Sequence, residues 1–213
     1  MEAAEATALA KKALKIVVPY IKAELRKDKA NRYSLKSDWT LPVVKKPLRD
    51  FENEAFEIVT DGKVSVITVK AFDSTKEENH CDGASCAPDV FLGVDFRPGA
   101  CFHDRWYEYW EELAEALGLT LKECRKLGDE IFASINYAEN GMSFKVKVVN
   151  TIYFRAVRLF GGFYHSAKRG GKAVLAVVLM ALCLSGCAGC VGTIFDDDGA
   201  GYTPPDLEKV LED

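Results

Sequence analysis

Residues of the types used for acid–base chemistry stand close together in the middle of the chain. His103 and Asp104 are consecutive, Tyr107 follows one helical turn after His103, and Asp129 falls in the next predicted helix. Consecutive helical residues point about 100° apart, so His103 and Asp104 can border one cavity and face different partners. A carboxylate bound to one imidazole nitrogen fixes the tautomer of the ring and strengthens it as a base. We therefore predict that His103 is a general base oriented by Asp129.

The same arrangement leaves Asp104 to bind a cation. Backbone carbonyls of the Asp82–Ser85 loop, which includes Gly83 and Ser85, would complete an oxygen shell for Ca²⁺. Zn²⁺ is the second choice, because the candidate Cys and His ligands match no standard zinc spacing; they are His80, Cys81, Cys86, Cys101 and His103. Buried free thiols are the simpler explanation of these cysteines.

A structural role competes with the catalytic one. An acidic residue near the start of a helix suits the helix dipole, and His103 flanks an apolar stripe, so the His-Asp pair alone does not establish chemistry.

Four short motifs follow one another in a specific order along the middle of the chain. They are Cys81–Ser85, Pro98–Tyr107, Gly128–Phe132 and Ala156–Gly161. This ordered set resembles a bacteriophage and prophage family defined only as a domain of unknown function, over about residues 64–162. The resemblance implies a phage origin and carries no activity.

The His-Asp-x-x-Tyr helix is also similar to that of secreted phospholipase A2 enzymes. Carried over residue by residue, the resemblance implies that His103 is the base for water and Asp104 the calcium ligand. Asp129 would orient the base, and Tyr107 would be its second support. The chain departs from that family because the glycine-rich calcium loop is not found.

The elements that must position these residues are predicted from periodicity. Helices are expected over residues 99–117, from Thr120 onward with a Thr120–Glu123 capping box, and over 147–164. Phe56–Val59 and Val64–Val69 alternate around an Asp-Gly pair, which predicts a hairpin. Residues 28–54 and 73–99 are expected to be mostly loop, with a strand near 39–44. The predicted class is α+β: a small hairpin or sheet with a three-helix core, an N-terminal helical arm and a C-terminal membrane helix.

The apolar segment near the C-terminus predicts attachment to a membrane. Residues 173–195 contain no charged residue, and a helix of that length crosses a hydrocarbon core of about 30 Å. Lys168, Arg169 and Lys172 precede it and an aspartate run follows, so the positive-inside rule keeps the domain in the cytoplasm with the tail across the membrane. The sequence before Cys187 also resembles a lipobox, which makes Cys187 a candidate for lipidation. Close packing of small residues is the alternative.

These boundaries divide the chain into an N-terminal helical arm (1–31), a globular α+β domain (32–167), a membrane or lipobox-like segment (168–195) and a short acidic tail (196–213). The arm or the membrane helix is the expected surface for homo-oligomers. A formal net charge of −4 argues against nucleic-acid binding.

The leading hypothesis is a phage-derived, membrane-attached hydrolase, with a metal-dependent site for phospholipid esters. The alternative is a non-enzymatic phage accessory protein, acting in lysis or envelope modification, whose His-Asp cluster is structural.

Overall fold

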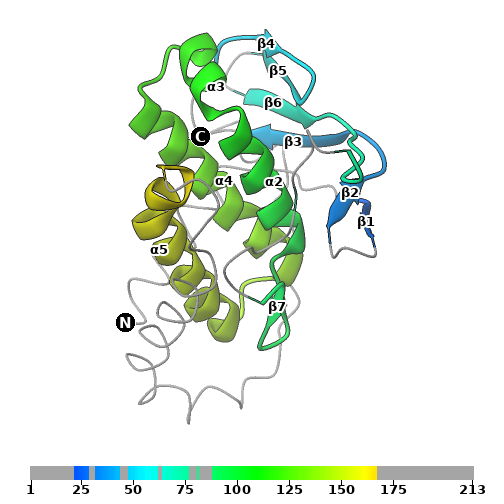
Figure 1. The fold of residues 1–213 in the computed structure, drawn as a ribbon. Coiled ribbons are helices and arrows are strands. Elements are labelled where there is room, and N and C mark those ends of the chain that lie inside the picture. The colour runs from blue at the N-terminus through cyan, green and yellow to red at the C-terminus, as the bar shows by residue number, and fades with distance from the viewer. Residues whose placement is uncertain are drawn as a thin grey trace.

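A computed structural model describes the part of the chain that surrounds the candidate residues. It covers residues 22–28, 32–43, 48–61, 64–76, 81 and 88–166, without the side chains of residues 156 and 159–166. Within that part, short antiparallel strands pack against a group of four helices (Figure 1). This arrangement agrees with the predicted α+β class. No described helix is both long and apolar enough to cross a membrane, and the predicted membrane segment lies outside the described residues.

The main sheet contains the predicted hairpin. Its four antiparallel strands lie in the order β3-β6-β5-β4. They are β3 (Trp39–Val43), β4 (Phe51–Glu52), β5 (Phe56–Asp61) and β6 (Val64–Val69). The second strand has the predicted bounds, but β5 is two residues longer than expected: Asp61 pairs with Val64, which leaves residues 62–63 between the strands, so the Asp-Gly pair is not the central pair of the turn.

Two smaller hairpins stand where the sequence predicted a helix or a loop. Leu25–Lys27 (β1) pairs with Tyr33–Leu35 (β2), so residues 22–28 are not part of a helical arm. Val90–Phe91 (β7) pairs with Val94–Asp95 (β8) inside the predicted 73–99 loop. Strands of two or three residues are too short to show a period of two, so the alternation pattern does not reveal them.

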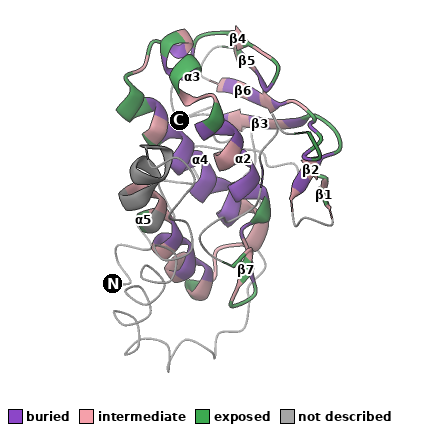
Figure 2. Ribbon diagram, in the orientation of Figure 1, coloured by how far each residue is buried: buried purple, intermediate pink, exposed green. Residues whose placement is uncertain are grey.

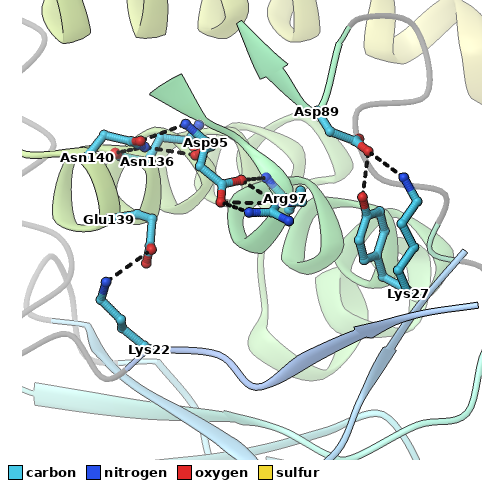
Figure 3. A network of polar contacts seen from close by, with 9 residues as sticks. Lys22, Lys27, Asp89, Asp95, Arg97, Asn136, Glu139 and Asn140 are labelled. Carbon is cyan, nitrogen blue, oxygen red and sulfur yellow. Dashed lines mark hydrogen bonds and ion pairs between the residues drawn. The ribbon is translucent and has the colours of Figure 1, made fainter. Parts of the chain in front are cut away.

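A polar network joins the described N-terminal residues to Asp89 and to Glu139, which lies within residues 121–140 (Figure 3). Lys27 lies 3.6 Å from Asp89, and the Tyr33 hydroxyl donates a 2.6 Å hydrogen bond to the same carboxylate. Lys22 reaches Glu139 at 3.4 Å. These contacts attach the segment before residue 32 to the domain, although the sequence placed a boundary there.

The helices follow in order along the second half of the described chain. They are α2 (Arg97–Glu108), α3 (Trp110–Leu117), α4 (Leu121–Asn140) and α5 (Phe144–Ser166). The single helix predicted over 99–117 is therefore wrong, because it is interrupted at Tyr109. The Tyr109 ring packs edge-on against Phe56 of the sheet, with centroids 6.3 Å apart, and the Arg105 guanidinium lies over its face at 5.1 Å. These contacts with the sheet and with Arg105 are not visible in the helical periodicity.

The predicted start of α4 is confirmed. The Thr120 side chain accepts from the Glu123 backbone N–H, and the Glu123 carboxylate accepts from the Thr120 backbone N–H, which completes the capping box. Cys124, Leu127, Ile131 and Ile135 of the predicted stripe are buried, but Leu121 is 48% exposed. The third predicted helix, 147–164, is a shorter version of α5.

The core lies between the sheet and α2, α3 and α4, and a second cluster fills the space between α4 and α5. The middle of α4 is buried on nearly every side (Figure 2). Phe56 of β5 contacts the rings of Phe102 and Trp106 on α2 at 6.2 and 5.6 Å. The sheet thereby supports α2 on one side while α4 supports it on the other.

Gly128 lets α2 and α4 approach closely. A Cβ atom at this position would meet Cδ1 of Trp106 at 2.3 Å and its Nε1 at 2.7 Å. Trp106 is fully buried and donates a 3.0 Å hydrogen bond from Nε1 to the Cys124 carbonyl, so its indole has little freedom to move. Gly128 immediately precedes Asp129, and this close approach therefore sets the distance between the candidate residues on the two helices.

Replacing Gly128 tests this contact. Gly128→Ala gains about 1 kcal/mol of helix propensity, but overpacking a rigid core costs up to about 3 kcal/mol. We expect a net loss of about 1 kcal/mol or more in the free energy of unfolding, measured by denaturant titration, with a change in tryptophan fluorescence. Lys126→Ala, an exposed position on the same helix, is the control and should stay near the wild-type value. Equal or higher stability of Gly128→Ala would contradict the close approach.

Candidate functional site

The structure brings the predicted base and its predicted partner together. His103 lies on α2 and Asp129 on α4, and Nε2 of the imidazole is 3.0 Å from Oδ1 of the carboxylate. Asp129 is completely buried, whereas the His103 side chain keeps 13% of its surface exposed. The pair is therefore anchored at its carboxylate end and open to solvent at its imidazole end.

Two further side chains bind the same carboxylate. The Tyr107 hydroxyl, one turn after His103, donates to Oδ1 of Asp129 at 2.8 Å. Nη1 of Arg158, on α5, donates to Oδ2 at 2.7 Å. Both oxygens of the buried carboxylate thus have partners, as a charge removed from water requires.

The electrostatics of the cluster follow from these contacts. Burial by itself would raise the pKa of the Asp129 carboxyl, but the hydrogen bond and charge of His103, with the bonds from Arg158 and Tyr107, outweigh it and lower this pKa. Burial beside the carboxylate raises the pKa of Tyr107. Asp129 is therefore an anion and Tyr107 a protonated donor across the neutral range.

The orientation of the ring decides which nitrogen can react. Nε2 of His103 is engaged by Asp129, and the ring packs against Tyr107 and Phe132, with centroids 4.1 and 5.5 Å away. Within the described part of the chain, Nδ1 has no hydrogen-bond partner. When Asp129 holds the proton on Nε2, Nδ1 carries the lone pair and can accept a proton from water.

The candidate metal ligands are only partly described. Asp104 is half-buried on α2, next to His103, while Asp82, Gly83 and Ser85 lie outside the described residues. The described residues hold no group of three or more His, Cys, Asp or Glu side chains arranged for a metal. Of the candidate ligands, Asp104 is therefore the described one, and a carboxylate oxygen is a ligand that suits Ca²⁺ better than Zn²⁺.

A disulfide replaces two of the thiols expected from the sequence. Cys81 and Cys101 are bonded, with Cα atoms 5.3 Å apart, and Cys124 is the free buried cysteine among the described residues. The expectation of scattered free thiols is wrong for this pair. Cys81 and Cys101 cannot act as thiolate zinc ligands while bonded, and the zinc candidates His80 and Cys86 lie outside the described residues. The sequence could not choose this pair, because cysteine spacing alone does not give connectivity.

The disulfide also places the chain that precedes the candidate calcium loop. Cys81 is buried and immediately precedes Asp82, and Cys101 stands two residues before His103 on α2. One end of the Asp82–Ser85 loop is thereby attached to the helix that carries His103 and Asp104.

Arg158 is the site residue that the sequence analysis did not assign. It falls within the Ala156–Gly161 motif, but no role followed from the motif. A basic residue on a largely apolar helix indicates pairing with a buried acidic residue. The sequence does not indicate which acidic residue that is. Cys187, the candidate for lipidation, lies outside the described residues.

Replacing Asp129 tests the buried cluster through its pH dependence. Asp129→Asn leaves Arg158 without its anion, and we expect a loss of about 3 kcal/mol in the free energy of unfolding at pH 7. Because the folded pKa of Asp129 is lowered, its contribution is fully present above the unfolded value near 4 and disappears as the pH falls through the folded pKa. Denaturant titrations at pH 7 and at decreasing pH below about 4 should therefore show the gap between wild type and variant closing.

Glu52→Gln is the matched control for this experiment. Glu52 is an exposed carboxylate whose pKa is lowered by Lys70 at the surface, and its removal should change stability little. A gap for Asp129→Asn that stays constant with pH would show that the anionic carboxylate is not what stabilises the cluster.

Comparisons with known proteins add no family assignment. No family model matches the chain, and comparison with curated proteins and with solved structures gives no significant match. The phage resemblance and the similarity to phospholipase A2 therefore stay predictions from sequence motifs. The function must be argued from the geometry of the His103–Asp129 cluster.

Proposed function

We propose that this protein is a membrane-attached hydrolase in which His103 activates water for attack on an ester. The observation that carries the proposal is the orientation of His103: its Nε2 binds the buried Asp129, and its Nδ1 has no hydrogen-bond partner among the described residues. A carboxylate that holds one ring nitrogen fixes the tautomer and stabilises the imidazolium formed during the reaction. Tyr107 and Arg158 hold that carboxylate in place.

The chemical step follows from this orientation. Nδ1 of His103 takes a proton from water while the water oxygen forms a bond to the carbonyl carbon of the ester. The bond from that carbon to the alcohol oxygen then breaks, and the imidazolium returns its proton to the leaving oxygen. The products are a carboxylic acid and an alcohol, and no redox partner is needed.

Ca²⁺ is proposed as the partner of this step. Asp104 and the carbonyls of the Asp82–Ser85 loop would hold it. When bound, the ion polarises the carbonyl of the ester. The position of Asp104 beside His103 and the attachment of Cys81 to Cys101 support this choice of ligands.

Esters of phospholipids are the proposed substrates, because the apolar segment over 173–195 would hold the domain at a bilayer. Two features of the chain favour opposite sides of the membrane for the domain. The basic residues before the segment favour a cytoplasmic domain. The Cys81–Cys101 disulfide favours an oxidising compartment, where Ca²⁺ is also abundant enough for weak sites. Because the cytoplasm keeps thiols reduced, the proposed compartment of the domain is the oxidising one.

A non-enzymatic role remains the second candidate, and Arg158 favours it. The Asp129 carboxylate already has a cationic partner in Arg158, at 2.7 Å, so the cluster satisfies a buried charge without any reaction. In that case the cluster would join α2, α4 and α5 in a phage accessory protein that acts at the membrane.

Replacing His103 separates the two candidates. Wild-type protein in mixed micelles with a phospholipid should release fatty acid in the presence of Ca²⁺, and His103→Asn should lower this rate by roughly 10²- to 10⁴-fold. The free energy of unfolding should fall by no more than about 1.5 kcal/mol, the value of one hydrogen bond. Asp104→Asn should lose the dependence on Ca²⁺. Absence of hydrolysis by the wild type, or equal rates for wild type and His103→Asn, would leave the structural role.

The compartment is tested through the disulfide. In cells that make the full chain, Cys81 and Cys101 should resist a thiol-labelling reagent until a reductant is added, and Cys86→Ser should not change this. Reduction of the purified protein should lower its free energy of unfolding by about 3 kcal/mol. The double variant Cys81→Ser/Cys101→Ser should be insensitive to reductant. Labelling of both cysteines in cells without reduction would place the domain in the cytoplasm.

A further inference from the structure

A hollow of about 320 Å³ is lined in part by Arg158, the arginine that binds the Asp129 carboxylate. It is lined by Trp110, Leu121, Lys122, Arg125 and Arg158. These residues come from the first turn of α3, the first two turns of α4 and position 158 of α5. Three of the five described residues that line it are cationic, and none of these five is acidic.

Two of the three cations of this hollow have no acidic partner among the described residues, and the third, Arg158, is paired with Asp129. Arg125 donates from Nη2 to the backbone carbonyl of Arg158 at 2.5 Å, and its buried Nε has no hydrogen-bond partner among the described residues. Arg158 is fixed by Asp129. Within the described part of the chain, neither Lys122 nor Arg125 forms an ion pair. Two oriented guanidinium groups and an ammonium group that converge in this way suit the oxygens of a phosphate.

Nearby features add to this preference for an anion. The hollow opens at the first residues of α4, where the positive end of a 20-residue helix dipole attracts anions. Glu123, the acidic residue in that turn, is engaged with Thr120 in the capping box. Glu123 is not among the described residues that line the hollow.

The apolar part of the rim indicates where the phosphate comes from. Leu121 is 48% exposed beside the cations, and Trp110 is half-buried, with its ring stacked on Tyr107 at 5.8 Å. Tryptophan favours the boundary between lipid and water, and basic residues at that depth attract anionic headgroups. An exposed leucine would enter the acyl region beside a bound headgroup, whereas a soluble phosphate gains nothing from it.

The position of the hollow along the chain agrees with a lipid ligand. Arg158 lies near the end of α5, which runs beside the first turns of α4 (Figure 1). After α5 the sequence continues through Lys168, Arg169 and Lys172 into the apolar residues 173–195. Arg158 is thus ten residues before Lys168, the first of the basic residues that precede the predicted membrane segment.

We infer that this hollow binds the phosphate of an anionic phospholipid headgroup and docks the domain on an anionic bilayer. Arg158 contacts both the headgroup site and the carboxylate that orients His103. The inferred docking site does not require His103 to be catalytic, because headgroup binding requires only the cations and the apolar rim. If the docking inference is wrong, saturable binding of anionic headgroups is absent. If the proposed function is wrong, hydrolysis of phospholipid is absent.

The test measures headgroup binding by the full chain in neutral detergent micelles. Phosphatidylglycerol, phosphatidylcholine or inorganic phosphate is added at constant micelle number, and tryptophan fluorescence is followed. Trp110→Phe identifies the signal of the tryptophan that lines the hollow. We expect a saturable response to phosphatidylglycerol alone, weakened at least fivefold in Lys122→Gln and further in Arg125→Lys, which keeps the charge but loses the bidentate geometry.

Lys126→Gln is the matched control, since Lys126 is an exposed lysine of the same helix that does not line the hollow. It removes one positive charge, as Lys122→Gln does, and should leave the affinity within twofold of wild type. Equal weakening by the two lysine variants would overturn the site in favour of unspecific charge attraction. An equal response to phosphatidylcholine, or equally tight binding of inorganic phosphate, would overturn the anionic lipid as the ligand.

Discussion

The buried carboxylate of Asp129 is the constraint on which the helical part of the structure depends. It has no contact with water, so its charge must be balanced by donors that other helices supply. His103 and Tyr107 come from α2, and Arg158 comes from α5. One anion therefore joins three helices at a single point. Gly128, the residue before it, removes the side chain that would otherwise hold α2 and α4 apart.

This arrangement also connects the two proposed activities of the molecule. His103 lies where the cluster reaches solvent, and Arg158 lies where it reaches the cationic hollow. A headgroup phosphate bound in the hollow would compete with Asp129 for the Arg158 guanidinium. Arg158 thus belongs to both proposed sites, as the partner of the Asp129 carboxylate and as a lining residue of the hollow.

Local sequence signals gave correct predictions where neighbouring residues alone decide the structure. The Thr120–Glu123 capping box and the hairpin of β5 and β6 are of this kind, because their partners are three residues apart or adjoin one turn. The prediction of His103 with Asp129 also succeeded, since both residues fall on strongly periodic helices. Predictions failed at Tyr109, where distant contacts interrupt the helix, and at β1, which pairs with β2 where a helix was expected.

The sequence by itself determined the α+β class of the described part, the start of α4 and the hairpin of β5 and β6. These features rest on periodicity, capping and turn chemistry, which act within a few residues. Only the tertiary structure decided that Arg158 completes the cluster, that Cys81 bonds to Cys101, and that Lys122 and Arg125 converge beside Trp110. Each of these contacts joins residues from different elements. The distances between such elements are set by how the whole core packs, and no local pattern records them.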